Sequence, residues 1–118
     1  MHTIIPGILR REGKVMLPFG VMGGQYQSTG HARFVTNLED YGMTPQAAID
    51  APRSFAEFGE LQMEQGYSDA VCQELGGLRH TVVRRARPLG GAQAIMIHEN
   101  GLLEGGSDPR KDGCALGY

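Results

Sequence analysis

The sequence has little of several features that mark common functional classes. It has no excess of positive charge, since 11 Lys and Arg stand against 13 Asp and Glu, for a net charge of -2. Neither nucleic acid nor an anionic membrane is therefore expected as a partner. The one basic cluster, residues 84–87, is too short for a nucleic-acid-binding stripe and is more typical of a solvated strand end. No apolar run approaches membrane-spanning length.

Cysteine and recognisable cofactor motifs are also scarce. Cys72 and Cys114 are the only cysteines; they could pair, but two are too few for a disulfide framework. Neither has a histidine partner identifiable from spacing, which argues against a cysteine hydrolase. The histidines show no pair at metal-ligand spacing, so no metal site is expected; they are His2, His31, His80 and His98. Walker A, GxGxxG and HExxH motifs are absent, and no cofactor is expected.

Glycine, in contrast, is abundant. The 118 residues, enough for one domain, include 18 glycines, which stand singly or in pairs between apolar runs, as turns do in a strand-rich chain. The first apolar runs predict a hairpin, with a strand at residues 3–9, a turn at 11–14 and a return strand at 15–17. Their near-continuous apolar character indicates a sheet covered on both faces.

Helical patterns follow the hairpin. Tyr26, Gly30, Phe34 and Leu38 recur every four residues and form one face, with His31, Val35 and Tyr41 beside it, which predicts a helix that Gly42 ends. Thr44 as N-cap and Pro45 as the first helical residue predict a short second helix.

The second half of the chain adds one helix and more strands. Ser68 is the expected N-cap of a third helix, at residues 69–75, which Gly76 and Gly77 end. A hairpin turn is expected at Glu99–Gly101. The expected strands lie at residues 55–63, 80–83, 91–97 and 102–106. The fold class by this pattern is α+β, with helices layered against a sheet.

The diglycine Gly23–Gly24 lies where a strand pattern ends and a long helical pattern begins. Glycine permits positive φ and lets a ligand approach bare backbone N–H groups. Beside a helix N-terminus, such groups favour negative charge. The pair is therefore a candidate anion or oxyanion cradle. The alternative is a turn that uses glycine for steric reasons only.

Thr3 is the first hydroxyl that could carry out chemistry. N-terminal nucleophile hydrolases use a threonine whose own α-amine acts as base. Met1 and His2 precede Thr3, so removing Met1 alone would not expose it. Thr3 is expected to be a strand hydroxyl in or near a pocket. The polar segment 108–112 is expected to hold its own backbone.

Six segments read in order resemble the C-terminal part of a γ-glutamyltranspeptidase (γ-glutamyltransferase). They cover nearly the whole chain, and they are His2–Pro6, Phe19–Gly24, Asp40–Met43 with Ala51–Arg53, Gly90–Ile95, Gly106–Arg110 and Gly117–Tyr118.

The resemblance implies a fold and a mechanism. Members of this family are N-terminal nucleophile hydrolases with a four-layer αββα sandwich, and their precursors cut themselves into a large and a small subunit. The new N-terminal threonine attacks a γ-glutamyl amide, as in glutathione-like compounds, and water or an amine then takes the acyl group. In that scheme the N–H groups of Gly23 and Gly24 form the oxyanion hole.

The sequence departs from the family pattern in two places. The threonine nucleophile precedes the matching segment and has no counterpart, so residues 1–118 are expected to form a single domain, the later part of a small subunit. Alone it should be inactive, with the remainder of the precursor as its partner. Where well-studied members have a serine pair that contacts the glutamyl α-carboxylate, this sequence has His2 and Thr3. The resemblance therefore makes them candidate substrate-binding residues and leaves a related acylase specificity open.

A second hypothesis is a stand-alone binding or interaction domain that kept the half-fold and lost the chemistry. In either case a half-sandwich should expose apolar sheet surface, so the chain is expected to self-associate, which light scattering tests. The compartment stays open, because any export signal would lie outside this chain.

Overall fold

The computed structural model describes residues 4–117, which fall into two compact units. The first consists of Met1–Asp50 and Gly90–Tyr118, and the second of Ala51–Leu89. A single domain over residues 1–118 stays a prediction. Among the described residues, no helix combines the length and the apolar character needed to cross a membrane.

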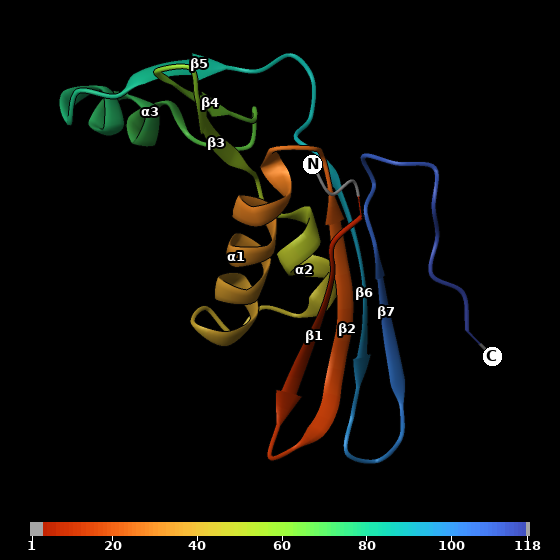
Figure 1. Ribbon diagram of the computed structural model, residues 1–118. Coiled ribbons are helices and arrows are strands. Elements are labelled where there is room, and N and C mark those ends of the chain that lie inside the picture. The colour runs from red at the N-terminus through yellow and green to blue at the C-terminus, as the bar shows by residue number, and fades with distance from the viewer. Residues whose placement is uncertain (1–3, 118) are drawn as a thin grey trace. The chain divides into compact units, whose positions relative to one another are not determined.

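The first unit is a four-stranded antiparallel sheet with helices on one face (Figure 1). Its strand order is β1-β2-β6-β7, and helices α1 and α2 follow β2 in the chain. The elements are β1 (Pro6–Arg11), β2 (Lys14–Met22), α1 (Tyr26–Glu39), α2 (Pro45–Asp50), β6 (Gly91–Ile97) and β7 (Leu103–Ser107).

The second unit is a small mixed sheet with one helix. Its strands are β3 (Ser54–Glu57), β4 (Glu60–Met63) and β5 (Thr81–Arg84), and its helix is α3 (Asp69–Gly77). Strand β4 pairs antiparallel with β3 and parallel with β5. With the first unit, this architecture confirms the α+β fold class.

The predicted caps are confirmed. The Thr44 hydroxyl accepts a hydrogen bond from the N–H of Ala47 at 3.3 Å, and the Ser68 hydroxyl accepts one from Val71 at 3.3 Å. Each cap satisfies a first-turn N–H that has no partner within its helix.

Three predicted boundaries are wrong. The strand expected at residues 55–63 is two paired strands, β3 and β4. Helix α3 continues through Gly76 and Gly77, and the left-handed residue that follows it is Arg79, with φ 72°. Strand β2 does not stop at Leu17 but continues through Pro18 to Met22. Pro18 pairs with Ile8 of β1, but it has no backbone N–H to donate to a second neighbouring strand. The β2–β6 pairing accordingly begins one residue later, at Phe19.

The core of the first unit lies between the sheet and its helices. Phe19 and Ala94 are paired across β2 and β6 and are both buried, so they share the face that the helices cover. The Phe19 ring lies 5.1 Å from that of Phe34 on α1. Ile49 on α2 is fully buried.

The opposite face of this sheet, called the open face below, carries exposed apolar side chains. Successive strand residues alternate between faces, so the neighbours of the buried positions point away from the helices. Five apolar side chains on this face are 37–62% exposed: Ile8, Met22, Ile95, Ile97 and Leu103. An apolar face of this kind marks an interaction surface. Coverage on both faces and self-association of the chain stay predictions.

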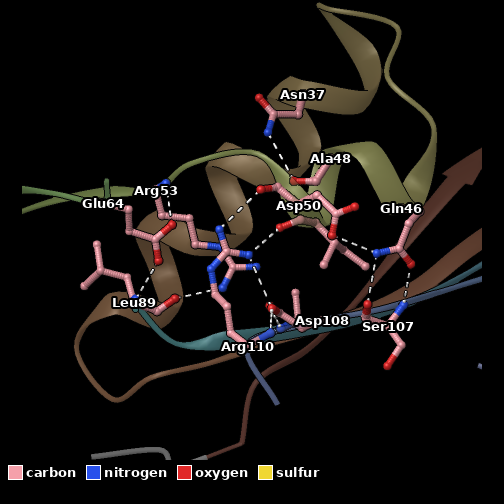
Figure 2. Close-up of polar contacts among 12 residues, drawn as sticks. Asn37, Gln46, Ala48, Asp50, Arg53, Glu64, Leu89, Ser107, Asp108 and Arg110 are labelled. Carbon is pink, nitrogen blue, oxygen red and sulfur yellow. Dashed lines mark hydrogen bonds and ion pairs between the residues drawn. The ribbon is translucent and has the colours of Figure 1, made fainter. Parts of the chain in front are cut away.

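A buried aspartate ties the start of β6 to the C-terminus of α2 (Figure 2). Asp108 is fully buried. Its Oδ2 accepts from the Ala92 N–H at 2.7 Å, and its own N–H donates to the Ala92 carbonyl at 3.1 Å. Its Oδ1 accepts from the backbone N–H and the guanidinium of Arg110 at 2.9 and 3.3 Å. That guanidinium also donates to the carbonyls of Ile49 and Asp50. The prediction that segment 108–112 holds its own backbone is confirmed for Asp108, whereas the Arg110 guanidinium holds the backbone of α2 instead.

Replacing Asp108 with alanine should lower the free energy of unfolding by about 3 kcal/mol, because it leaves a buried N–H and a mostly buried guanidinium short of an acceptor. Urea unfolding followed by circular dichroism measures the change. Asp112→Ala, at an exposed position of the same segment, should stay within about 0.5 kcal/mol of the original. Equal losses in the two variants would contradict the anchoring role of Asp108.

Candidate functional site

The diglycine forms the connection between β2 and α1. Gly23 and Gly24 are both exposed, with φ values of 137° and 60°. Their carbonyls accept hydrogen bonds from the N–H groups of Tyr26 and Gln27 at 3.1 and 3.2 Å. The carbonyl oxygens are thereby tied to the first turn of α1.

The N–H groups of the diglycine have no acceptor among the described residues. Within residues 4–117, neither Gly23 nor Gly24 donates a backbone hydrogen bond. The N-cap residue Gln25 makes no side-chain cap either. The N-terminus of α1 thus has exposed amide donors and the positive end of a 14-residue helix, an arrangement suited to negative charge.

Gly90 supports the diglycine from the residue just before β6. It precedes β6, and a Cβ atom built on it would lie 2.2 Å from the Met22 carbonyl oxygen and 2.9 Å from the Tyr26 ring. A Cβ built on Gly23 would in turn lie 3.0 Å from the Cα of Gly90. Backbone therefore packs on backbone here, and any side chain at Gly90 would displace the loop.

A buried amide supports the loop from α1. Gln27 is 2% exposed, and its Nε2 donates to the Gly24 carbonyl at 3.2 Å. The next turn of the helix places His31 Nδ1 2.7 Å from the Gln27 carbonyl oxygen, and the His31 ring lies 5.1 Å from that of Phe19. The sequence interpretation missed Gln27 and Gly90. The signal for Gln27 was its position in the first turn after the diglycine.

Another buried network joins the beginning of the second unit, at Arg53, to its end, at Leu89 (Figure 2). Glu64 accepts hydrogen bonds from the backbone N–H groups of Arg53 and Leu89 at 3.0 and 2.7 Å. The Arg53 guanidinium donates to the Leu89 carbonyl at 2.7 Å. Arg53, part of one of the six matching segments, thus has a structural role within this unit.

The remaining candidate residues that the structure describes lie in separate places and form no common site. His2 and Thr3 lie outside the described residues. Cys72 and Cys114 are free thiols, and the Cys72 Sγ lies 3.8 Å from the sulfur of Met63. His98 contacts Glu104 at 2.9 Å. In the part of the chain that the structure describes, no group of three or more His, Cys, Asp or Glu side chains could hold a metal ion.

Comparison with known proteins decides the family. The family model described as gamma-glutamyltranspeptidase matches residues 1–118. The chain belongs to this family. It thereby shares the N-terminal nucleophile hydrolase fold of its relatives, and the resemblance stated from the six segments is confirmed.

The relatives include proteins with different names. The glutathione hydrolase-like YwrD proenzyme of Bacillus subtilis is 38% identical, over 98% of this chain and 24% of that protein. The acylase ACY 1 proenzyme of Pseudomonas sp. (strain SE83) is 33% identical, over 97% of this chain and 20% of that protein. Cephalosporin acylase from Bacillus halodurans superposes with a TM-score of 0.90 at 36% identity, over 99% of this chain and 23% of that one. The chain thus spans about a quarter or less of the length of these relatives.

Replacing Gly90 with alanine should destabilise the first unit by about 3 kcal/mol, because the new Cβ collides with backbone and the residue has φ 60°. Gly101→Ala is the matched control, since φ is +85° there and no atom lies within 4 Å of the new Cβ. It should lose only about 1 kcal/mol, for the backbone conformation alone. Urea unfolding compares the two, and equal losses would contradict close packing of Gly90 against the β2–α1 loop.

Proposed function

We propose that this chain supplies the oxyanion hole of an acyl-transferring amide hydrolase, with the N–H groups of Gly23 and Gly24 as its donors. The observation that carries the proposal is a pair of exposed glycines just before α1, neither of whose amides donates a hydrogen bond within residues 4–117. Donors fixed before the reaction stabilise charge as it develops on the substrate oxygen, and each such donor commonly contributes a few kcal/mol.

The proposed reaction proceeds by acyl transfer through an N-terminal threonine of the same precursor. Its hydroxyl oxygen attacks the amide carbon, its α-amine takes the hydroxyl proton, and the carbonyl electron pair moves onto oxygen. Gly23 and Gly24 hold that oxygen while the C–N bond breaks and the leaving nitrogen takes the proton. Water or an acceptor amine then attacks the ester, releases the acyl group and restores the hydroxyl.

The nucleophile and the rest of the pocket are assigned to polypeptide outside this chain. The relatives are proenzymes of which this chain covers 20–24%, so the remainder of a precursor is the proposed partner. γ-Glutamyl amides are the substrate class that the family suggests first. His2 and Thr3 are proposed to contact the acyl group, as the matching serine pair does in well-studied members.

A second candidate function is an interaction domain without chemistry. The open face favours it, because Ile8, Ile95 and Leu103 expose apolar surface that a partner could cover. This domain would not need the diglycine amides. The two candidates therefore differ in the effect of changing Gly24.

Gly24→Ala in the complete, self-cleaved protein should lower kcat/KM by about 100-fold or more. The new methyl group meets no protein atom within 4 Å, so it would occupy the space beside the donors that the substrate oxygen needs. Release of p-nitroaniline from acyl p-nitroanilides, the γ-glutamyl derivative included, measures the rate. Gly42→Ala is the matched control. It carries the same backbone cost, with φ 62° against 60° at Gly24, and both sites have open space around the new Cβ. Unchanged turnover in Gly24→Ala would remove the diglycine from the mechanism.

A further inference from the structure

A glycine leaves room for a substrate oxygen, but its own backbone does not keep its amide in one direction. Gly24 has φ +60°, and without a Cβ a glycine adopts positive and negative φ about equally readily. A donor that has to reorient during the reaction loses much of its effect on the barrier. Contacts from other residues are therefore needed to hold the Gly24 N–H in one orientation.

Gly24 lies between two peptide groups, and each of them is held through its carbonyl oxygen. The Gly23 carbonyl, in the peptide group that carries the Gly24 N–H, accepts from the Tyr26 N–H at 3.1 Å. The Gly24 carbonyl, in the next peptide group, accepts twice from Gln27, from its backbone N–H and from its Nε2, both at 3.2 Å. Holding both peptide groups fixes the two backbone rotations at the Gly24 Cα.

Only one of the two bonds from position 27 requires a glutamine. The backbone bond belongs to the first turn of α1, and a residue of another type would also supply it. It already gives the Gly24 carbonyl a partner, so the bond from the Gln27 Nε2 is not needed to satisfy that oxygen. The Gln27 side chain is nevertheless 2% exposed, and burying an amide costs free energy unless it is hydrogen-bonded. The additional bond therefore acts on the orientation of the loop.

We propose that Gln27 is a positioning residue of the oxyanion hole. Its carboxamide holds the Gly24–Gln25 peptide group, and so keeps the Gly24 N–H directed at the substrate oxygen before the reaction begins. This inference rests on the proposed function, since it assumes that the Gly24 N–H binds that oxygen. Because Gln27 acts through Gly24 on charge that develops only in the transition state, its loss should lower kcat and leave KM nearly unchanged.

Asn37 provides a matched control in the same helix (Figure 2). It is also 2% exposed, and its Nδ2 donates to a backbone carbonyl, that of Ala48 on α2, at 3.3 Å. It lies ten residues beyond Gln27 in α1, about 15 Å further along the helix axis. Replacing Asn37 therefore removes a buried bond of the same kind far from the diglycine.

Gln27→Met and Asn37→Leu keep the approximate side-chain size and remove the amide. Each is made in the complete protein, with self-cleavage checked on a denaturing gel and stability measured by urea unfolding. On the acyl p-nitroanilide that the unaltered protein hydrolyses fastest, Gln27→Met should lower kcat about tenfold and change KM by less than about twofold. Asn37→Leu should keep both constants within about twofold of the original. A kcat in Gln27→Met no lower than in Asn37→Leu, or a loss confined to KM, would overturn the positioning role.

A double-mutant cycle tests whether Gln27 acts through Gly24. Once Gly24→Ala has disabled the donor, adding Gln27→Met should lower kcat by less than about twofold more, instead of about tenfold. Losses that multiply would show that Gln27 acts elsewhere and would overturn the inference. If Gln27→Met does not self-cleave, the cycle is measured with Gln27→Asn, whose amide is one methylene too short to reach the Gly24 carbonyl.

The same measurements separate the inference from the proposed function. A large loss of kcat in Gly24→Ala without a loss in the Gln27 variant overturns the inference and leaves the proposed function standing. If the unaltered, self-cleaved protein hydrolyses no acyl p-nitroanilide, the proposed function fails, and the inference with it.

Discussion

The proposed site depends on a close contact between two stretches of bare backbone. The β2–α1 loop at Gly23 packs against Gly90, with no room for a side chain at Gly90. Gly90 leads into β6, and β6 is fixed two residues later, where Ala92 forms hydrogen bonds in both directions with Asp108. The arrangement of the diglycine therefore depends on a carboxylate far along the chain, whose partner Arg110 also binds the end of α2.

This arrangement matters because an oxyanion hole works only when its donors are fixed in advance. Amides that had to reorient during the reaction would lose much of their effect on the barrier. Here the Gly23 carbonyl is held by the first turn of α1, which sets the orientation of the Gly23–Gly24 peptide group and so of the Gly24 N–H. The Gly23 N–H belongs to the Met22–Gly23 peptide group, whose carbonyl lies against Gly90. The helix is held against the sheet in turn by Phe34 and Phe19. The packing of the core therefore helps to hold the geometry of the site.

Sequence patterns over a few neighbouring residues predicted much of this fold. Contacts between residues far apart in the chain could not be predicted from them. Thr44 and Ser68 predict the starts of their helices because a cap acts on residues two or three positions away. The diglycine could also be predicted locally, because it stands directly between a strand pattern and a helical pattern. The extension of β2 past Pro18 pairs with β1 as far as Gly20 and with β6, about 70 residues later, from Phe19 to Met22. The pairing with β6 is a contact that local sequence does not encode. The roles of Gly90 and Glu64 were also missed, since their contacts lie across the chain and sequence spacing does not encode them.

The central claim is that Gly23 and Gly24 bind the oxygen that becomes negative during acyl transfer. A crystal structure of the complete, self-cleaved protein with a boronic acid analogue of the acyl group bound to the threonine hydroxyl tests it directly. The account predicts a boronate oxygen about 2.7–3.1 Å from both amide nitrogens. A boronate that bonds to the threonine but directs its oxygens away from both glycines would contradict it.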